Sequence, residues 1–106
     1  MKLILAIVND EDSGKLTDEL TKNKISVTKL ASTGGFLRSG NVTLMVGTEK
    51  ENVDNVIEII KSKCKARTEL AAPITASMGI ATSWPVEVEV GGATIFVIDV
   101  DRFEKV

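Results

Sequence analysis

Histidine and tyrosine are both absent from this chain of 106 residues, and cysteine occurs once. Without histidine the chain lacks the commonest general base and the commonest metal ligand, and the absence of tyrosine removes a further acid or base. The single cysteine, Cys64, excludes an intrachain disulfide and a multi-cysteine metal site. We therefore expect no enzymatic activity, no bound metal and no cofactor.

Long apolar runs and an excess of positive charge are also missing. The longest apolar run, Leu3 to Val8, is too short to span a bilayer and lacks the flanks of a cleavable signal. A net charge of -2 and a pI near 5.1 argue against binding to a nucleic-acid polymer, whose phosphates attract clustered Lys and Arg. We expect one cytoplasmic domain over residues 1–106 that does not associate with a membrane.

The first half of the chain alternates between strand and helix patterns. The uninterrupted run from Leu3 to Val8 predicts a strand buried on both faces. Acidic residues followed by Leu16 and Leu20 predict a helix within residues 9–24. Two further strands, in 25–33 and 41–47, flank a glycine-bearing stretch and predict a hairpin.

A second helix is predicted over residues 48–64, where Thr48 and Glu51 have the spacing of a capping box. Its apolar residues recur at helical spacing: Val53, Val56, Ile57, Ile60 and Cys64. Residues 65–84 then lose all periodicity, which predicts a long flexible loop. Cys64 continues the apolar stripe, so we interpret it as an inert thiol of the core.

The C-terminal part of the chain contains two more strand patterns. Residues 86–90 alternate Val and Glu, and 93–100 are nearly all apolar, with Gly91 and Gly92 between them. Two glycines between strands are typical of a tight hairpin. Asp99 and Asp101 share one side of this last segment, but nothing near them in the sequence completes a cation site.

The order of elements predicts an α+β fold, a ferredoxin-like βαββαβ sandwich with a short extra C-terminal strand and a long loop after the second helix. Both helices then cover one face of the sheet. The other face is left bare, although the strands at Leu3 to Val8 and Thr94 to Ile98 are apolar on both sides. We expect another copy of the chain to cover it.

The stretch "TKLASTGGFLRSGN", residues 28–41, gathers groups suited to an anionic, aromatic ligand. Glycine backbone N–H groups and neighbouring hydroxyls bind anionic oxygens. Phe36 offers a ring for stacking on a base, worth about 1 to 3 kcal/mol. Asn41 has a carboxamide that can pair with an adenine edge. Glycine-rich hairpin tips are also common, so the residues equally allow Phe36 and Leu37 to pack on a neighbouring subunit.

This stretch, followed by "VIEIIKSKCKAR" and "PVEVEVGGATIFVIDVDRFEK", resembles the PII-like cyclic di-AMP receptor family, called PstA or DarA. The resemblance runs from Lys2 to about Lys105. It implies a homotrimer of ferredoxin-like, PII-like subunits that binds cyclic di-AMP in clefts between neighbours. Members are signal-transduction proteins without known catalysis, and we expect ligand occupancy to be passed to an unknown downstream protein through loop ordering. The alternative is a PII-type sensor of ATP or ADP.

The resemblance also assigns roles to individual residues of the proposed ligand site. Thr28 would meet a phosphate, Asn41 would read the base edge, and the Gly47 backbone would add a hydrogen bond. The adenine pocket would be lined by Gly35, Phe36 and Leu37. Phe96 would form a wall from the adjacent subunit. Ser26 stands where several relatives have an arginine, which removes a cation from the phosphate site.

Overall fold

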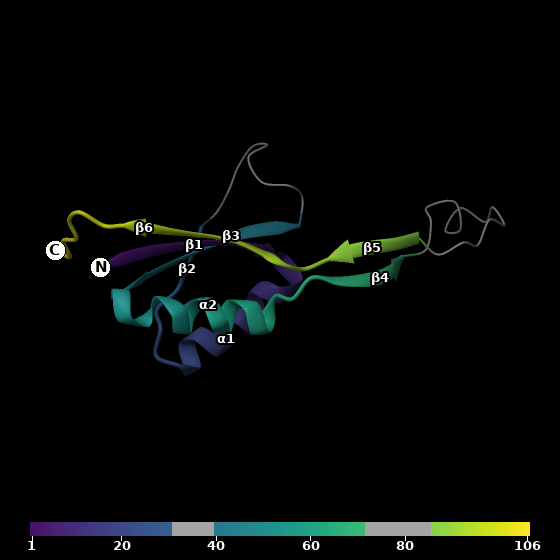
Figure 1. Cartoon of the computed structure of the whole chain (residues 1–106), viewed down its shortest axis with the longest axis horizontal. Coiled ribbons are helices and arrows are strands. Elements are labelled where there is room, and N and C mark those ends of the chain that lie inside the picture. The colour runs from purple at the N-terminus through teal and green to yellow at the C-terminus, as the bar shows by residue number, and fades with distance from the viewer. Residues whose placement is uncertain (31–39, 72–85) are drawn as a thin grey trace.

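The computed structural model describes residues 1–30, 40–71 and 86–106 (Figure 1). A sheet strand opens the chain, and two helices alternate with the remaining strands. In order, the elements are β1 (Lys2–Asn9), α1 (Asp10–Lys22), β2 (Thr28–Leu30), β3 (Asn41–Thr48), the 3-10 helix η1 (Lys50–Asn52), α2 (Val53–Lys63), β4 (Arg67–Ala71), β5 (Val86–Val90) and β6 (Ala93–Asp99).

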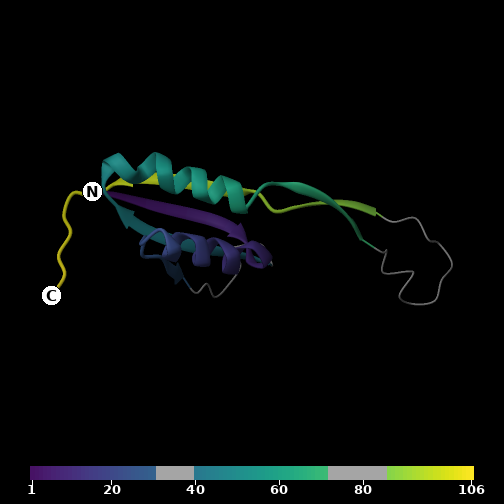
Figure 2. The same cartoon turned by 90° about the horizontal axis from the view of Figure 1, so that it is seen from below.

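The main sheet has the strand order β2-β3-β1-β6, and every neighbouring pair is antiparallel. Helices α1 and α2 lie side by side on one face of this sheet (Figure 2). Strand β1 is central, as its continuous apolar run predicts, and β2 and β3 form the predicted hairpin. The predicted ferredoxin-like α+β fold is therefore confirmed.

The core lies between the helices and this face of the sheet. Strand β1 alternates buried and half-buried residues, because only one of its faces is covered by helices within the chain. The core consists of apolar side chains from the main-sheet strands, both helices and the turn after α1: Ile4, Ala6, Val8, Leu16, Leu20, Ile25, Leu44, Val46, Val56, Ile60 and Cys64. Cys64 is 2% exposed, and burial raises the pKa of its thiol to about 11. The predicted core position of this thiol is confirmed.

A local signal explains where α1 begins, but the signal predicted for α2 is absent. Asn9 caps α1 by accepting a hydrogen bond from the Glu11 amide at 2.8 Å, and the acidic first turn complements the helix dipole. The predicted capping box at Thr48 and Glu51 is wrong. Thr48 is the last residue of β3, and α2 begins at Val53 after a turn of 3-10 helix, without a side-chain cap.

Three predictions for the second half of the chain are also wrong. Residues 67–71, which fall within the predicted loop 65–84, form β4 and pair with β5 in a separate two-stranded sheet. Gly91 and Gly92 do not close a hairpin between β5 and β6, because β6 pairs with β1. They are a connector between two sheets, and both have positive φ, of 85° and 82°. No strand follows Asp99 in the described residues, so the additional strands lie before β6 and not at the C-terminus.

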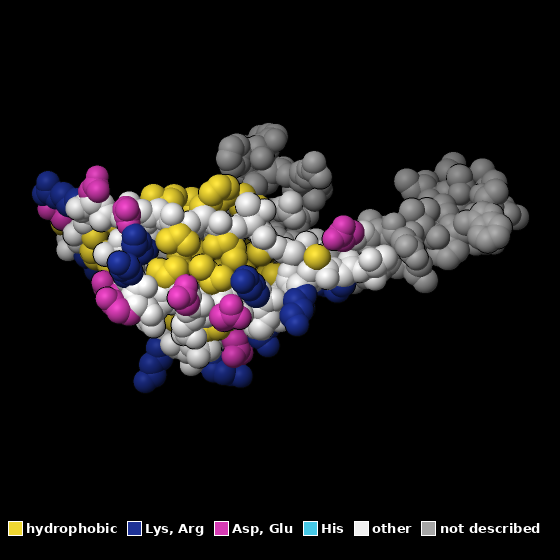
Figure 3. Space-filling model, viewed as in Figure 1, with side chains coloured by type: hydrophobic (Ala, Val, Ile, Leu, Met, Phe, Trp, Pro, Cys, Tyr) yellow, Lys and Arg dark blue, Asp and Glu magenta, His cyan; other side chains and the backbone are white. Residues whose placement is uncertain are grey.

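The second face of the main sheet is apolar and lacks a covering layer among the described elements. Residues that face each other across antiparallel strands share a face, so Leu5 lies beside Met45 and Phe96 on this side. The Phe96 side chain is 51% exposed, and Ile98 is similarly exposed. A separate hydrophobic patch lies between β6 and α2, at the β6 edge of the sheet (Figure 3). We refer to the sheet face that carries Leu5, Met45 and Phe96 as the bare face.

None of the helices in the described ranges is long and apolar enough to cross a membrane.

Candidate functional site

Three of the predicted ligand residues line one cavity at an end of the bare face. The β2–β3 hairpin places Thr28 opposite Met45, and Gly47 lies opposite Leu3 of the central strand. Ser26 precedes β2 and reaches the same space. The cavity has a volume of about 600 Å³, within the usual range for small-molecule sites. Its lining residues are Met1, Leu3, Ser26, Thr28, Met45, Gly47, Val100, Phe103, Glu104 and Lys105.

The lining combines hydroxyl donors with an apolar floor and an aromatic ring. Ser26 and Thr28 are exposed, so their hydroxyl groups are open to a ligand. Gly47 has no side chain, and a Cβ added there would meet no atom within 4 Å, which leaves the backbone approachable. Phe103 is 64% exposed and presents a ring surface at the cavity.

One cation at the cavity has no ion-pair partner among the described residues: the ammonium group of Lys105. The neighbouring Glu104 accepts a hydrogen bond from the Arg102 Nε at 3.1 Å, so its charge is already balanced. The amino group of Met1 lies 3.9 Å from the Glu49 carboxylate. This arrangement leaves Lys105 available to an anion in the cavity.

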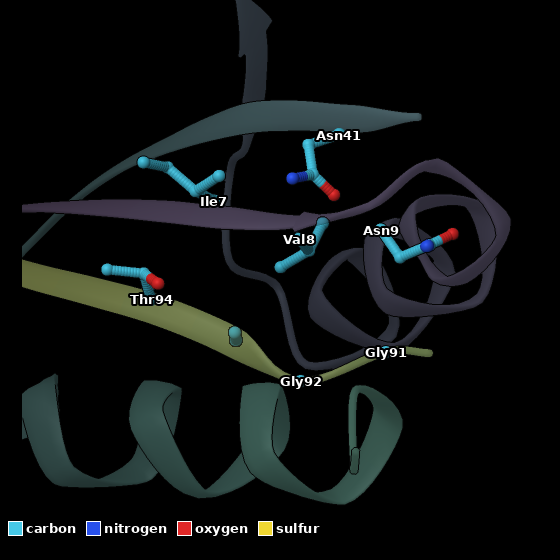
Figure 4. Close-up of a pocket in the computed structure, with 8 residues that line it drawn as sticks. Ile7, Val8, Asn9, Asn41, Gly91, Gly92 and Thr94 are labelled. Carbon is cyan, nitrogen blue, oxygen red and sulfur yellow. The ribbon is translucent and has the colours of Figure 1, made fainter. Parts of the chain in front are cut away.

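Asn41 lines a different and smaller hollow, of about 140 Å³, at the other end of β1 (Figure 4). It is the first residue of β3 and pairs in register with Asn9, and Figure 4 shows its carboxamide pointing from β3 toward β1. The connector glycines Gly91 and Gly92 form another wall. Because Asn9 already caps α1, Asn41 is the carboxamide here that remains free for a ligand.

The remaining predicted site residues lie apart from these two spaces or outside the described ranges. Phe96 is on the bare face opposite Leu5 and lines neither cavity. Gly35, Phe36 and Leu37 lie outside the described residues. A single chain therefore brings together Ser26, Thr28 and Gly47, and separates them from Asn41 and Phe96.

The C-terminal residues of the cavity were not part of the predicted site. Phe103 and Lys105 follow β6 in a segment without regular structure, so no periodic pattern in the sequence points to their position. The available signal was compositional: Phe103 is one of three phenylalanines and lies next to several charges.

Asp99, at the end of β6, is engaged in an ion pair. Lys2 donates a hydrogen bond to the Asp99 carboxylate across the β1–β6 ladder, and this bond lowers the pKa of Asp99. In the part of the chain that the structure describes, no three His, Cys, Asp or Glu side chains gather as a metal site would require.

Comparison with known proteins places these residues in a family. A solved structure of a functionally unknown protein from Pediococcus pentosaceus is 44% identical in sequence, with a TM-score of 0.76. The match covers 99% of this chain and 96% of that one. The family described as cyclic-di-AMP receptor matches residues 1–106. The chain is therefore a member of the cyclic-di-AMP receptor family.

Proposed function

We propose that this chain is a cytoplasmic signal-transduction protein that binds cyclic di-AMP in clefts between the subunits of a homotrimer. Residues 1–106 act as one PII-like receptor domain. The protein binds its ligand without transforming it, and uses no metal or additional cofactor.

The observation that supports this proposal most directly is the composition of the larger cavity. Cyclic di-AMP has two adenine rings and two negatively charged phosphodiester groups. The hydroxyls of Ser26 and Thr28 supply donors for a phosphate, and Lys105 supplies a positive charge. An exposed phenylalanine ring beside these donors suits a purine, since stacking tolerates any flat base. The cavity therefore matches both parts of the ligand.

The bare face supports an assembly of several copies. A lone chain would leave Phe96, Ile98 and other apolar side chains in water, and a second copy would bury them. Asn41 and Phe96 lie outside the larger cavity of one chain. In a trimer, Phe96 from one copy would complete the site of its neighbour, together with Gly35, Phe36 and Leu37.

We further propose that occupancy is passed to a downstream protein by the ordering of residues 65–84, of which 67–71 form β4. Hydrogen exchange of this segment, measured with and without cyclic di-AMP, tests the mechanism. Slower exchange in the complex is expected, because an ordered backbone protects its amides. Identical exchange in both states would contradict it.

Titration calorimetry with cyclic di-AMP, ATP and cyclic di-GMP tests the ligand. Saturable heat with cyclic di-AMP alone is expected. Tighter binding of ATP would favour the alternative, a PII-type sensor of ATP or ADP, because the same hydroxyls, ring and cation suit any adenine nucleotide. No binding of any of the three would overturn the proposal.

Substitution of Asn41 by alanine is expected to weaken cyclic di-AMP binding more than about tenfold, which corresponds to a lost contact worth over about 1.4 kcal/mol. Asn55→Ala is the matched control, since Asn55 is exposed on α2. Equal affinity of the Asn41 variant and the control would remove Asn41 from the site. Phe36→Ala, measured in the same way, tests the predicted stacking contact.

A further inference from the structure

A buried carboxylate on α1 joins the body of the protein to the β4–β5 hairpin. Asp12 lies in the first turn of α1 and is 1% exposed. Two guanidinium nitrogens of Arg67 bind it, with Nη1 at 3.3 Å from Oδ2 and Nη2 at 3.2 Å from Oδ1. Arg67 is the first residue of β4 and is paired with Val90, the last residue of β5. This contact therefore holds the base of the hairpin.

The hairpin needs such an attachment because it is a separate two-stranded sheet. Strands β4 and β5 pair with each other and project beyond the end of the main sheet (Figures 1 and 2). Two-stranded hairpins are marginally stable alone. Arginine bound through both nitrogens of its planar group fixes direction as well as distance. The pairing with Asp12 thus sets the angle at which the hairpin leaves the body.

The close packing around Gly91 supports this interpretation. A Cβ added to Gly91 would lie 2.8 Å from the Arg67 Nη1 and 2.7 Å from the Lys65 carbonyl oxygen. The connector between β5 and β6 is therefore pressed against the ion pair, and only glycine fits. Gly91 and Asn41 also line the same hollow.

The same turn of α1 is attached to the end of the glycine-bearing stretch. The Asp10 amide donates to the Gly40 carbonyl at 2.6 Å, and the Asp10 carboxylate lies 3.4 Å from the Lys29 ammonium. Asn9 and Asn41 are partners in the β1–β3 ladder. Residues 9–12 thus contact both Gly40–Asn41 and the base of the hairpin.

We propose that Asp12 and Arg67 form a latch that fixes the β4–β5 hairpin on the first turn of α1 and couples its orientation to Gly40 and Asn41. Neither residue needs to touch the ligand, so both are positioning residues. The latch itself concerns the ligand-free protein, and only its coupling to occupancy rests on the proposed function. When Gly40 and Asn41 are held by a ligand, the first turn of α1 is held with them, and the latch carries this constraint to the hairpin.

The chain offers a matched control for the latch. Lys15 also binds the Asp12 carboxylate, at 3.2 Å, but it lies on α1 itself. Removing Lys15 weakens the charge pairing of Asp12 without detaching the hairpin. Arg67 is 35% exposed, so Arg67→Gln is compatible with folding.

Spin labels on Glu89→Cys in β5 and Lys61→Cys in α2, in a Cys64→Ala background, report the hairpin orientation as a distribution of distances. Labelled chains are diluted with unlabelled ones so that distances within one chain dominate. Arg67→Gln and Asp12→Asn are expected to broaden the distribution at least about twofold, whereas Lys15→Gln leaves it unchanged. A distribution in Arg67→Gln as narrow as in the parent would overturn the latch, as would equal broadening in Lys15→Gln.

Cyclic di-AMP added to the same samples tests the coupling. Narrowing of the distribution is expected in the parent and not in Arg67→Gln. Equal narrowing in both would refute the coupling and leave the latch intact. Absence of any calorimetric binding in the parent would instead overturn the proposed function, while the ligand-free comparison would still stand.

Discussion

Asp12 shows how one residue can keep a charge inside the protein. Burial alone would raise the pKa of this carboxyl group, but hydrogen bonds from Arg67 and Lys15 outweigh that effect and hold the pKa below its usual value. The position in the first turn of α1 adds the favourable helix dipole. A carboxylate supported in this way contributes to stability only while it is ionised.

Asp12→Asn is expected to lower the free energy of unfolding at neutral pH by about 3 kcal/mol, since it leaves a guanidinium without its buried partner. The difference from the parent should persist above the unfolded pKa of about 3.9. It should shrink as the pH falls through the lowered folded pKa, because the unfolded chain takes up the proton first. Urea unfolding between pH 7 and pH 3 measures it, with exposed Asp18→Asn as the control. A difference that does not change with pH would contradict the assignment.

Glycine has opposite consequences in two elements of the fold. Gly14 lies in α1 with no atom within 4 Å of an added Cβ, and its φ is not positive. Gly91 lies in the connector before β6, where φ is 85° and a Cβ would clash with backbone. The first glycine only weakens a helix, whereas the second is required by its element.

Gly14→Ala is therefore expected to raise the free energy of unfolding by about 0.5 to 1 kcal/mol, through better helix propensity and a less flexible unfolded chain. Gly91→Ala should lower it by about 1 to 3 kcal/mol, because it adds backbone strain and displaces Arg67 or Lys65. Thermal and urea unfolding of the two variants measure the sign of each change in the free energy of unfolding. The same sign in both would contradict the account of the connector.

Elements with strong local patterns were predictable from the sequence, and those defined by distant pairing were not. The apolar run of β1 predicts a central strand correctly, although only one of its two faces is buried within the chain. The helical spacing of Val56 and Ile60 predicts their burial correctly. Strand β4 was missed, because "RTELA" has no alternation and its partner lies more than ten residues away in sequence. Gly91 and Gly92 have the composition of a hairpin turn, yet β6 pairs with β1 at the far end of the chain. Local sequence cannot reveal whether β6 will pair with β5, its neighbour in the chain, or with the distant β1.

Of the residues that line the larger cavity, some were among the predicted site residues and others were not. Ser26, Thr28 and Gly47 come together because the register of a short hairpin follows from its alternating strands. Phe103 and Lys105 reach the same cavity through an irregular segment after β6, whose path depends on the completed sheet. The cavity therefore combines three predicted residues, on or beside the hairpin, with residues of a terminal segment that the sequence did not predict. Their role in ligand binding stays a prediction.

At the scale of the whole molecule, we expect copies of the chain to associate through the uncovered sheet face. The helices cover one side only, and the other carries an exposed phenylalanine on β6. An apolar surface of this kind in an otherwise charged protein is typical of an interface between subunits.

The native chain is expected to have a solution mass three times its own 11.4 kDa. Phe96→Glu should raise the concentration at which the assembly half-dissociates by at least about tenfold, since it places a charge in an apolar interface. Sedimentation velocity over a dilution series measures this. Lys22→Glu, which introduces the same side chain at the exposed end of α1, should leave the mass unchanged. An unaltered assembly in Phe96→Glu would exclude β6 from the interface.

The lone thiol at the end of α2 has a practical consequence. Cys64 is buried and protonated at neutral pH, and no other cysteine competes with it. A thiol reagent can modify it only when the structure around the end of α2 opens, so the rate of modification depends on how often this region opens. The native sequence thus contains a single reporter of local opening, which can be followed without any substitution.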